Sequence, residues 1–124
     1  VEPPFRELGI KDSRIIKKVE NIAEFFSKAR MGITSSGRTM HEFLYLGIPI
    51  ISISQHDRED KHSLNSHEFI KYLGQANKLS EERIFKSIDD LYSNPKKVNY
   101  LKKNIENIVD GQGLGRITEF IVNI

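Results

Sequence analysis

The residues best suited to chemistry form a turn of small side chains, T-S-S-G, directly before a helical pattern. A helix N-terminus carries partial positive charge and N–H groups without internal partners, which together favour an anion such as phosphate. Ser35, Ser36 and Gly37 would let an oxygen approach the backbone closely, and Arg38 and Thr39 would add donors in the first helical turn. The same residues also suit an ordinary helix N-cap, and the spacing alone leaves both interpretations open.

A second polar stretch, Q-H-D-R-E-D-K-H, begins at Gln55 directly after an apolar run. Ligands of open α/β sheets bind beyond the carboxyl ends of strands, so this loop is placed to contact polar groups of a ligand. A run of charges is more often solvated surface. His56 and His62 flank acidic residues, but their spacing with Asp57 and Asp60 fits no standard ligand pattern, so no metal is expected.

Three further ionisable residues need an interpretation. Glu42 lies in the first half of the predicted helix and, taken alone, has the chemistry of a general base. His41 is expected on the exposed side of that helix, and His67 at the rim of the following element. No D-x-D motif for a metal ion is present in the sequence.

The apolar pattern predicts the elements that position these residues. A short strand ends at Ile33, a helix begins at Arg38 and ends at Gly47, and residues 50–53 form a buried strand. A helix over 22–29 precedes this unit, behind the capping-box pattern N-I-A-E. Alternation of strands and helices favours a parallel sheet, so the fold class is α/β.

The same signals predict the remaining elements. They are a strand at Ile15, Ile16 and Val19, a helix over 64–73 ending at Gly74, an edge strand over 76–79, a helix after Ser80, a helix from Asn94–Pro95 to Asp110–Gly111, and a short helix after Gly113 and Gly115. Residues 1–14 are expected to be a linker or irregular segment and residues 15–124 a single domain.

Composition limits the classes of protein. The 124 residues suffice for one core, and 38% of them are hydrophobic, without an apolar run near the ~20 residues needed to span a bilayer. There is no cysteine, which excludes disulfides and thiolate metal sites, and a net charge of +2 does not demand nucleic acid. No signal peptide is visible, so a cytoplasmic location is expected. The first residue is Val, which suggests a fragment of a longer protein.

The run S-S-G-R-T-M-H-E-F-L-Y-L-G-I-P-I-I-S-I resembles the nucleotide-sugar motif in the C-terminal half of GT-B glycosyltransferases, especially the transferase that makes lipid II. It also resembles the UDP-sugar hydrolases of pseudaminic acid synthesis and related spore-coat polysaccharide proteins. Three outlying pieces agree in order over residues 15–122: V-E-N-I-A-E-F-F-S-K-A-R-M-G-I, Q-H-D-R-E-D and D-G-Q-G-L-G-R-I. The resemblance implies a Rossmann-like three-layer domain with a short parallel sheet, the second half of a GT-B fold.

The resemblance also assigns residues to parts of a nucleotide sugar, most readily a UDP-sugar. Glu42 matches the carboxylate that accepts hydrogen bonds from the ribose hydroxyls. The other matches are Ser36, Gly37, Arg38 and Thr39 for the diphosphate, Val19 and Ile22 beside the nucleobase, and Gln55, Asp57, Arg58, Glu59, Asp60 and Asn65 for the sugar hydroxyls. The lipid II enzyme has paired Gln residues where this chain has Glu59 and Asp60, which leaves the sugar open.

What the resemblance implies for activity is limited by the half of the fold that the chain holds. Acceptor and catalytic base come mainly from the N-terminal domain of GT-B enzymes, so this chain is expected to bind the donor without being a complete catalyst. It would need an N-terminal acceptor domain or a partner subunit, and any membrane contact would come from that half. No cofactor and no metal are expected. The alternatives are a domain of a nucleotide-sugar hydrolase and a non-catalytic binding module.

Overall fold

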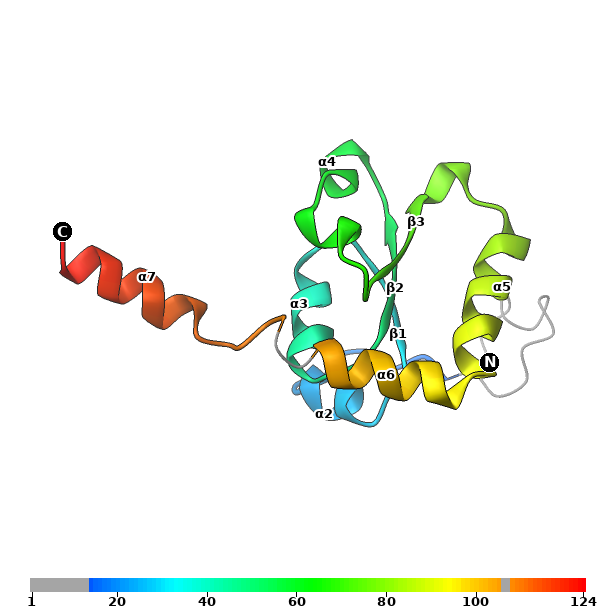
Figure 1. Cartoon of the computed structure of the whole chain (residues 1–124), viewed down its shortest axis with the longest axis horizontal. Helices are drawn as coiled ribbons and strands as arrows, with labels where there is room; N and C mark the ends of the chain where they lie inside the picture. Colours follow the sequence, from blue (N-terminus) through cyan, green and yellow to red (C-terminus); the bar gives the residue numbers. More distant parts are fainter. Residues whose placement is uncertain (1–13, 106–107) are drawn as a thin grey trace.

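A parallel sheet of three strands forms the centre of this computed structural model, which describes residues 14–105 and 108–124 (Figure 1). The strands are β1 Gly32–Ser35, β2 Ile50–Ser54 and β3 Lys71–Gln75, and they are hydrogen-bonded in that order. In register, Gly32 faces Ile50 and Ile51 faces Lys71. The predicted α/β class with a short parallel sheet is therefore confirmed, and the arrangement is consistent with a Rossmann-like fold.

Helices connect and cover the strands. They are α2 Ile22–Ser27, α3 Arg38–Tyr45, α4 Asp57–Asp60, the 3-10 turns η1 Ser63–Ser66 and η2 Ala76–Lys78, α5 Glu81–Tyr92, α6 Pro95–Ile105 and α7 Gly113–Val122. The predicted βαβ unit is confirmed, because α3 begins at Arg38 and joins β1 to β2. Two predicted caps are confirmed: Ser80 accepts a hydrogen bond from the Arg83 backbone amide, and Asn94 accepts one from the Lys97 backbone amide. The capping box predicted at Asn21 is wrong, because the Asn21 side chain makes no cap hydrogen bond to α2.

The core lies on both faces of the sheet. Successive residues of a strand point to opposite faces, so Ile50 packs with α3 while Ile51 packs with α5. The first cluster consists of Met40, Phe43, Leu44, Ile48, Ile50, Ile70 and Ile105, and the second of Ile51, Leu73 and Leu91. Figure 1 shows α3 and α5 on opposite sides of the sheet, which gives three layers.

The predicted helix over 64–73 is wrong, because η1 and then β3 occupy this part of the chain. The spacing of Ile70 and Leu73 suits a helix face, but these two side chains belong to clusters on opposite faces of the sheet. Gly74, expected to end that helix, lies inside β3 with φ +99°. Between the residue pairs Ser52–Tyr72 and Ser54–Gln75, β3 has one residue more than β2, as in a β-bulge. Gly74 lies in this extra length of β3.

Three other predicted elements also differ. Residues 14–20 form no strand, and Ile15 and Ile16 are each 44% exposed, so no sheet gives them a buried face. Residues 76–78 form η2 instead of an edge strand. The helix predicted to reach Asp110 ends at Ile105, with Ile108 in a turn. The linker predicted over 1–14 lies outside the described residues except for Arg14.

The last helix projects away from the other elements (Figure 1). It begins at Gly113, so both glycines expected to precede it lie within it. Arg116 in its first turn bonds the segment before the helix. Arg116 Nη1 donates to Asp110 Oδ2 at 2.7 Å, and Arg116 Nη2 donates to Asp110 Oδ1 at 3.1 Å. These bonds, with one from the Gln112 amide, lower the pKa of Asp110 to about 2. Among the described helices, none has the length and apolar character needed to cross a membrane.

Candidate functional site

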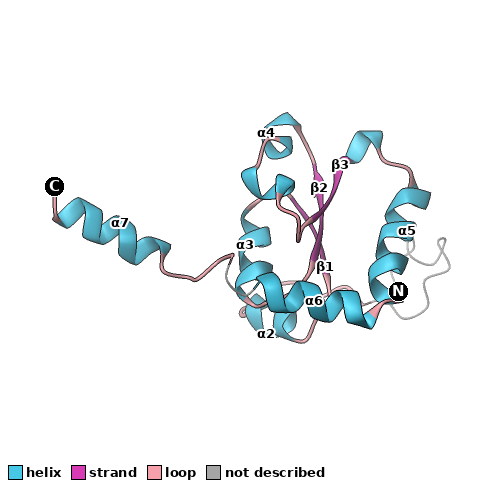
Figure 2. Ribbon diagram, viewed as in Figure 1, coloured by secondary structure: helices cyan, strands magenta, loops and turns pink. Residues whose placement is uncertain are grey.

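A hollow of about 380 Å³ lies where β1 and β2 end. Figure 2 shows α4 and η2 at this same end of the sheet, where the connections leave the carboxyl ends of the strands. In parallel α/β sheets this end binds ligands. The lining comes from the turn before α3, from α3 itself and from the segment after β2: Ser36, Gly37, Arg38, His41, His56, Arg58, Glu59 and His62.

The turn before α3 leaves the helix N-terminus without a side-chain cap. Gly37 is the N-cap residue, and no side chain bonds the first amides of α3. The hydroxyl of Ser36 is turned inward, 2.6 Å from the Ser52 hydroxyl, and Ser36 is only 1% exposed. Of the two interpretations of T-S-S-G, the structure therefore disfavours an ordinary Ser cap. Ser36, Gly37 and Arg38 line the hollow, so the start of α3 lies at its wall.

Basic and hydrogen-bond-donating groups dominate the lining. Arg38 comes from α3 and Arg58 from α4, and both face the hollow. His56 Nδ1 accepts from the Glu59 amide at 3.4 Å, and His62 Nδ1 accepts from the Leu64 amide at 3.2 Å. In the neutral ring this leaves the proton on Nε2, which is then a donor. The hollow thus combines two guanidinium groups with imidazole donors, a set suited to an anion.

The histidines of the hollow were not among the residues expected to bind a ligand. His41 is exposed, as expected, but it also lines the hollow, with its ring centroid 5.4 Å from that of His62. His56 and His62 are N-cap residues of α4 and η1. A histidine just before a short polar helical segment was the available signal. The described residues hold no group of three or more His, Cys, Asp or Glu that could bind a metal ion.

The carboxylate of Glu59 also lines the hollow, beside these arginines and histidines. Glu59 Oε2 accepts from the Gln55 amide at 2.7 Å, and Glu59 Oε1 lies 4.0 Å from His56 Nε2. A Cβ built on Gly37 would lie 3.7 Å from Glu59 Oε1, which places the carboxylate beside the turn before α3. The Glu59 side chain is 18% exposed. It is therefore held in place and still reachable from the hollow.

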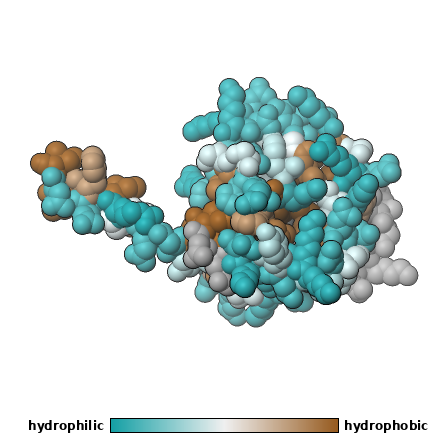
Figure 3. Space-filling view, viewed as in Figure 1, coloured by the Kyte–Doolittle hydropathy of each residue, from teal (hydrophilic) through white to brown (hydrophobic). Residues whose placement is uncertain are grey.

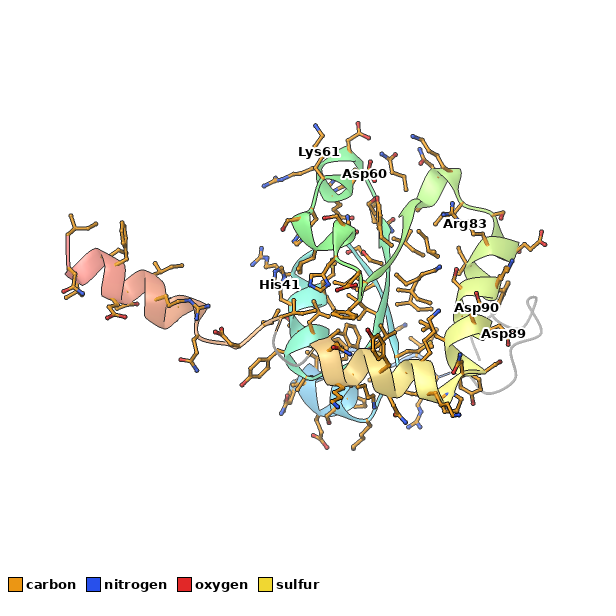
Figure 4. The ribbon with its side chains drawn as sticks, viewed as in Figure 1. His41, Asp60, Lys61, Arg83, Asp89 and Asp90 are labelled. Atoms are coloured by element: carbon orange, nitrogen blue, oxygen red, sulfur yellow. The ribbon has the colours of Figure 1, made fainter. Side chains whose placement is uncertain are left out.

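The acidic residues on either side of Glu59 instead attach α4 to the sheet. Asp60 bonds the hydroxyls of Ser54 and Tyr72, which are themselves 2.6 Å apart. The side-chain amide of Gln75 donates from Nε2 to Asp57 Oδ1 at 2.8 Å and to Asp60 Oδ2 at 3.3 Å. Figure 4 shows Asp60 and its neighbour Lys61 at the tip of α4. Asp57 and Asp60, expected to read sugar hydroxyls, thus bond β2 and β3 side chains and do not line the hollow.

Asn65, another expected sugar contact, closes the α4 loop. Its Nδ2 donates to the carbonyl of Glu59 at 2.9 Å, and its Oδ1 accepts from Ser52 at 3.2 Å. Gln55 contributes its backbone amide to Glu59. Neither residue lines the hollow.

The remaining expected contacts lie around or away from the hollow. Ser35 ends β1, with its hydroxyl 3.6 Å from a Cβ built on Gly37, and Thr39 is half-buried in the first turn of α3. Glu42 is exposed on α3 and does not line the hollow. Val19 precedes α2 and Ile22 begins it, and Figure 1 places α2 at the opposite end of the sheet from α4.

Comparison with known proteins adds no family. No protein-family model matches the chain. No curated protein matches it, and no solved structure does either.

Proposed function

We propose that the hollow binds the diphosphate of a nucleotide sugar, with a UDP-sugar as the first candidate. The observation that carries this proposal is the uncapped N-terminus of α3 flanked by Arg38 and Arg58 at the carboxyl end of a parallel sheet. Guanidinium groups pair with phosphate oxygens through two hydrogen bonds at once, which suits them better than lysine to a diphosphate. Polar residues cover this end of the molecule in Figure 3.

The same arrangement supports a chemical role in sugar transfer. When the sugar leaves, negative charge builds on the diphosphate, and groups that already point at that charge stabilise the transition state. In this proposal Arg38, Arg58 and the α3 amides supply that stabilisation without a metal. The chain would be the donor-binding domain of a GT-B glycosyltransferase-like enzyme, with the acceptor and catalytic base contributed by another domain or subunit.

The ribose contact is proposed for Glu42. It lies four residues after Arg38, so both side chains project from the same side of α3. Its exposed carboxylate is free to accept from two neighbouring hydroxyls of a ribose placed beyond the rim of the hollow. Because a charged hydrogen bond contributes about 1.5–3 kcal/mol, Glu42→Ala should weaken nucleotide binding while the fold is kept.

Titration calorimetry of the chain with UDP tests the proposal. Arg38→Gln and Arg58→Gln should each weaken binding about tenfold, which corresponds to about 1.4 kcal/mol. Arg83→Gln is the matched control, because it removes the same charge from the exposed surface of α5, away from His41 and the hollow (Figure 4). A folded sample that gives no heat with UDP, CDP or GDP contradicts the proposal. Equal affinities in the three arginine variants would contradict the assigned site.

A further inference from the structure

Among the described residues that line the hollow, Glu59 is the only one with a carboxylate. Its position affects which ligand the hollow binds more tightly. Its oxygens lie beside the turn before α3, held by the Gln55 amide at 2.7 Å. The Arg38 and Arg58 side chains face the same space. A diphosphate in the hollow therefore meets two cations and one fixed anion.

The two forms of a nucleotide ligand respond differently to that anion. A free nucleoside diphosphate has a terminal phosphate that loses a second proton near pH 6, which gives it roughly one more negative charge at neutral pH than a diphosphate esterified to a sugar. The esterified form also brings sugar hydroxyls, which donate hydrogen bonds that a carboxylate accepts. The Glu59 carboxylate thus repels the free nucleoside diphosphate more strongly than the nucleotide sugar. Only the nucleotide sugar has sugar hydroxyls that can donate hydrogen bonds to this carboxylate.

We propose that Glu59 makes the hollow discriminate between the intact nucleotide sugar and the free nucleoside diphosphate, in favour of the sugar. This inference rests on the proposed function of the same hollow. In the transfer step the acceptor oxygen forms a bond to the sugar carbon and loses its proton to the base of the other domain or subunit. The bond between the sugar carbon and the phosphate oxygen breaks, and its electron pair stays on the phosphate oxygen. The added charge then lies near Glu59, so the carboxylate promotes release of the nucleoside diphosphate once the sugar has been transferred.

The test compares UDP with UDP-glucose by titration calorimetry on the whole chain and on Glu59→Gln. The glutamine keeps an oxygen that can accept from the Gln55 amide and removes only the charge. The ratio of the UDP dissociation constant to that of UDP-glucose should fall about tenfold in Glu59→Gln, mainly through tighter UDP binding. Asp90→Asn is the control for net charge, since Asp90 lies on the exposed surface of α5 (Figure 4), and it should leave the ratio unchanged.

Each outcome bears on a different proposal. A ratio that stays the same in Glu59→Gln, with both ligands still bound, overturns the role of Glu59 and leaves the proposed function standing. Absence of binding by either ligand to either folded protein overturns both. Glu59→Ala provides a second variant that removes the charge together with the acceptor, and it should shift the ratio in the same direction. Inorganic pyrophosphate, which has no sugar, should bind Glu59→Gln more tightly than the unchanged chain.

Discussion

Ser52 lies in the middle of β2 with no exposed surface, and its hydroxyl joins three separate parts of the chain. It is 2.6 Å from the Ser36 hydroxyl in the turn before α3 and 3.2 Å from Asn65 Oδ1 in the loop after α4. It also lies 3.7 Å from the sulfur of Met40. One buried hydroxyl therefore links the turn before α3 to the loop after α4.

Ser52→Ala should lower the free energy of unfolding by about 1–3 kcal/mol, because it leaves buried polar groups without their partner. Urea denaturation measures this change through the midpoint and the slope of the transition. Ser93→Ala removes an exposed hydroxyl that bonds Asp89 at 3.0 Å, and it should change stability by less than about 0.5 kcal/mol. Equal effects of the two substitutions would show that the Ser52 contacts do not support the fold.

The turn of small residues shows what can be predicted at the residue scale. The composition T-S-S-G left two interpretations open, an anion site and an ordinary N-cap, and the start of α3 has no side-chain cap. Binding of an anion at this turn stays a prediction. The direction of the Ser36 hydroxyl could not be predicted, because its partner Ser52 lies sixteen residues away. Buried hydrogen bonds between distant residues have no local sequence signal.

At the scale of elements, the contact between β1 and α3 depends on Gly32. A Cβ built on Gly32 would lie 2.7 Å from the end of the Phe43 ring, which is buried and stacked on Phe26 at 4.0 Å. The ring therefore packs directly against the strand backbone. Only a residue without a side chain lets α3 lie this close to β1.

Gly32→Ala should destabilise the protein by about 1–3 kcal/mol, because the added methyl group overpacks the core at Phe43. Thermal and urea unfolding followed by circular dichroism give the change. Gly115→Ala provides the comparison, since nothing lies within 4 Å of a Cβ at that position in α7. A Gly32→Ala protein as stable as the Gly115→Ala protein would contradict the close packing of β1 on α3.

For the whole molecule, the described core belongs to the sheet, to the helices up to α6 and to Ile108 and Val109 in the segment after α6. Ile108 and Val109 still pack against the first cluster, whereas the apolar residues of α7 are exposed, Leu114 by 79% and Phe120 by 71%. Figure 3 shows apolar side chains on the surface of the projecting helix. The helix therefore adds little to the stability of the remaining structure.

A chain shortened after Asp110 should have the same urea midpoint as the full chain, because it loses no residue that packs in the core. A chain shortened after Asn104 serves as the control. It lacks Ile105, which has no exposed surface, together with Ile108 and Val109, and we expect it to unfold at clearly lower urea. A matching loss of stability in both shortened chains would indicate that α7 packs on the remainder of the protein in solution.

The sequence by itself determined the central βαβ unit. Its strands, the start of α3 at Arg38 and the end of α3 just before Gly47 follow from apolar period, small turn residues and helix stops, all of which are local. The caps at Ser80 and Asn94 were predictable for the same reason.

Tertiary structure alone decided β3 and the composition of the hollow. Ile70 and Leu73 are spaced as on a helix face, yet each is buried on a different side of the sheet, so packing overrode the period. His56, His62 and Glu59 come together with Arg38 only because β1 and β2 pair in parallel and end side by side. That pairing depends on contacts between residues far apart in the chain, which no local pattern records.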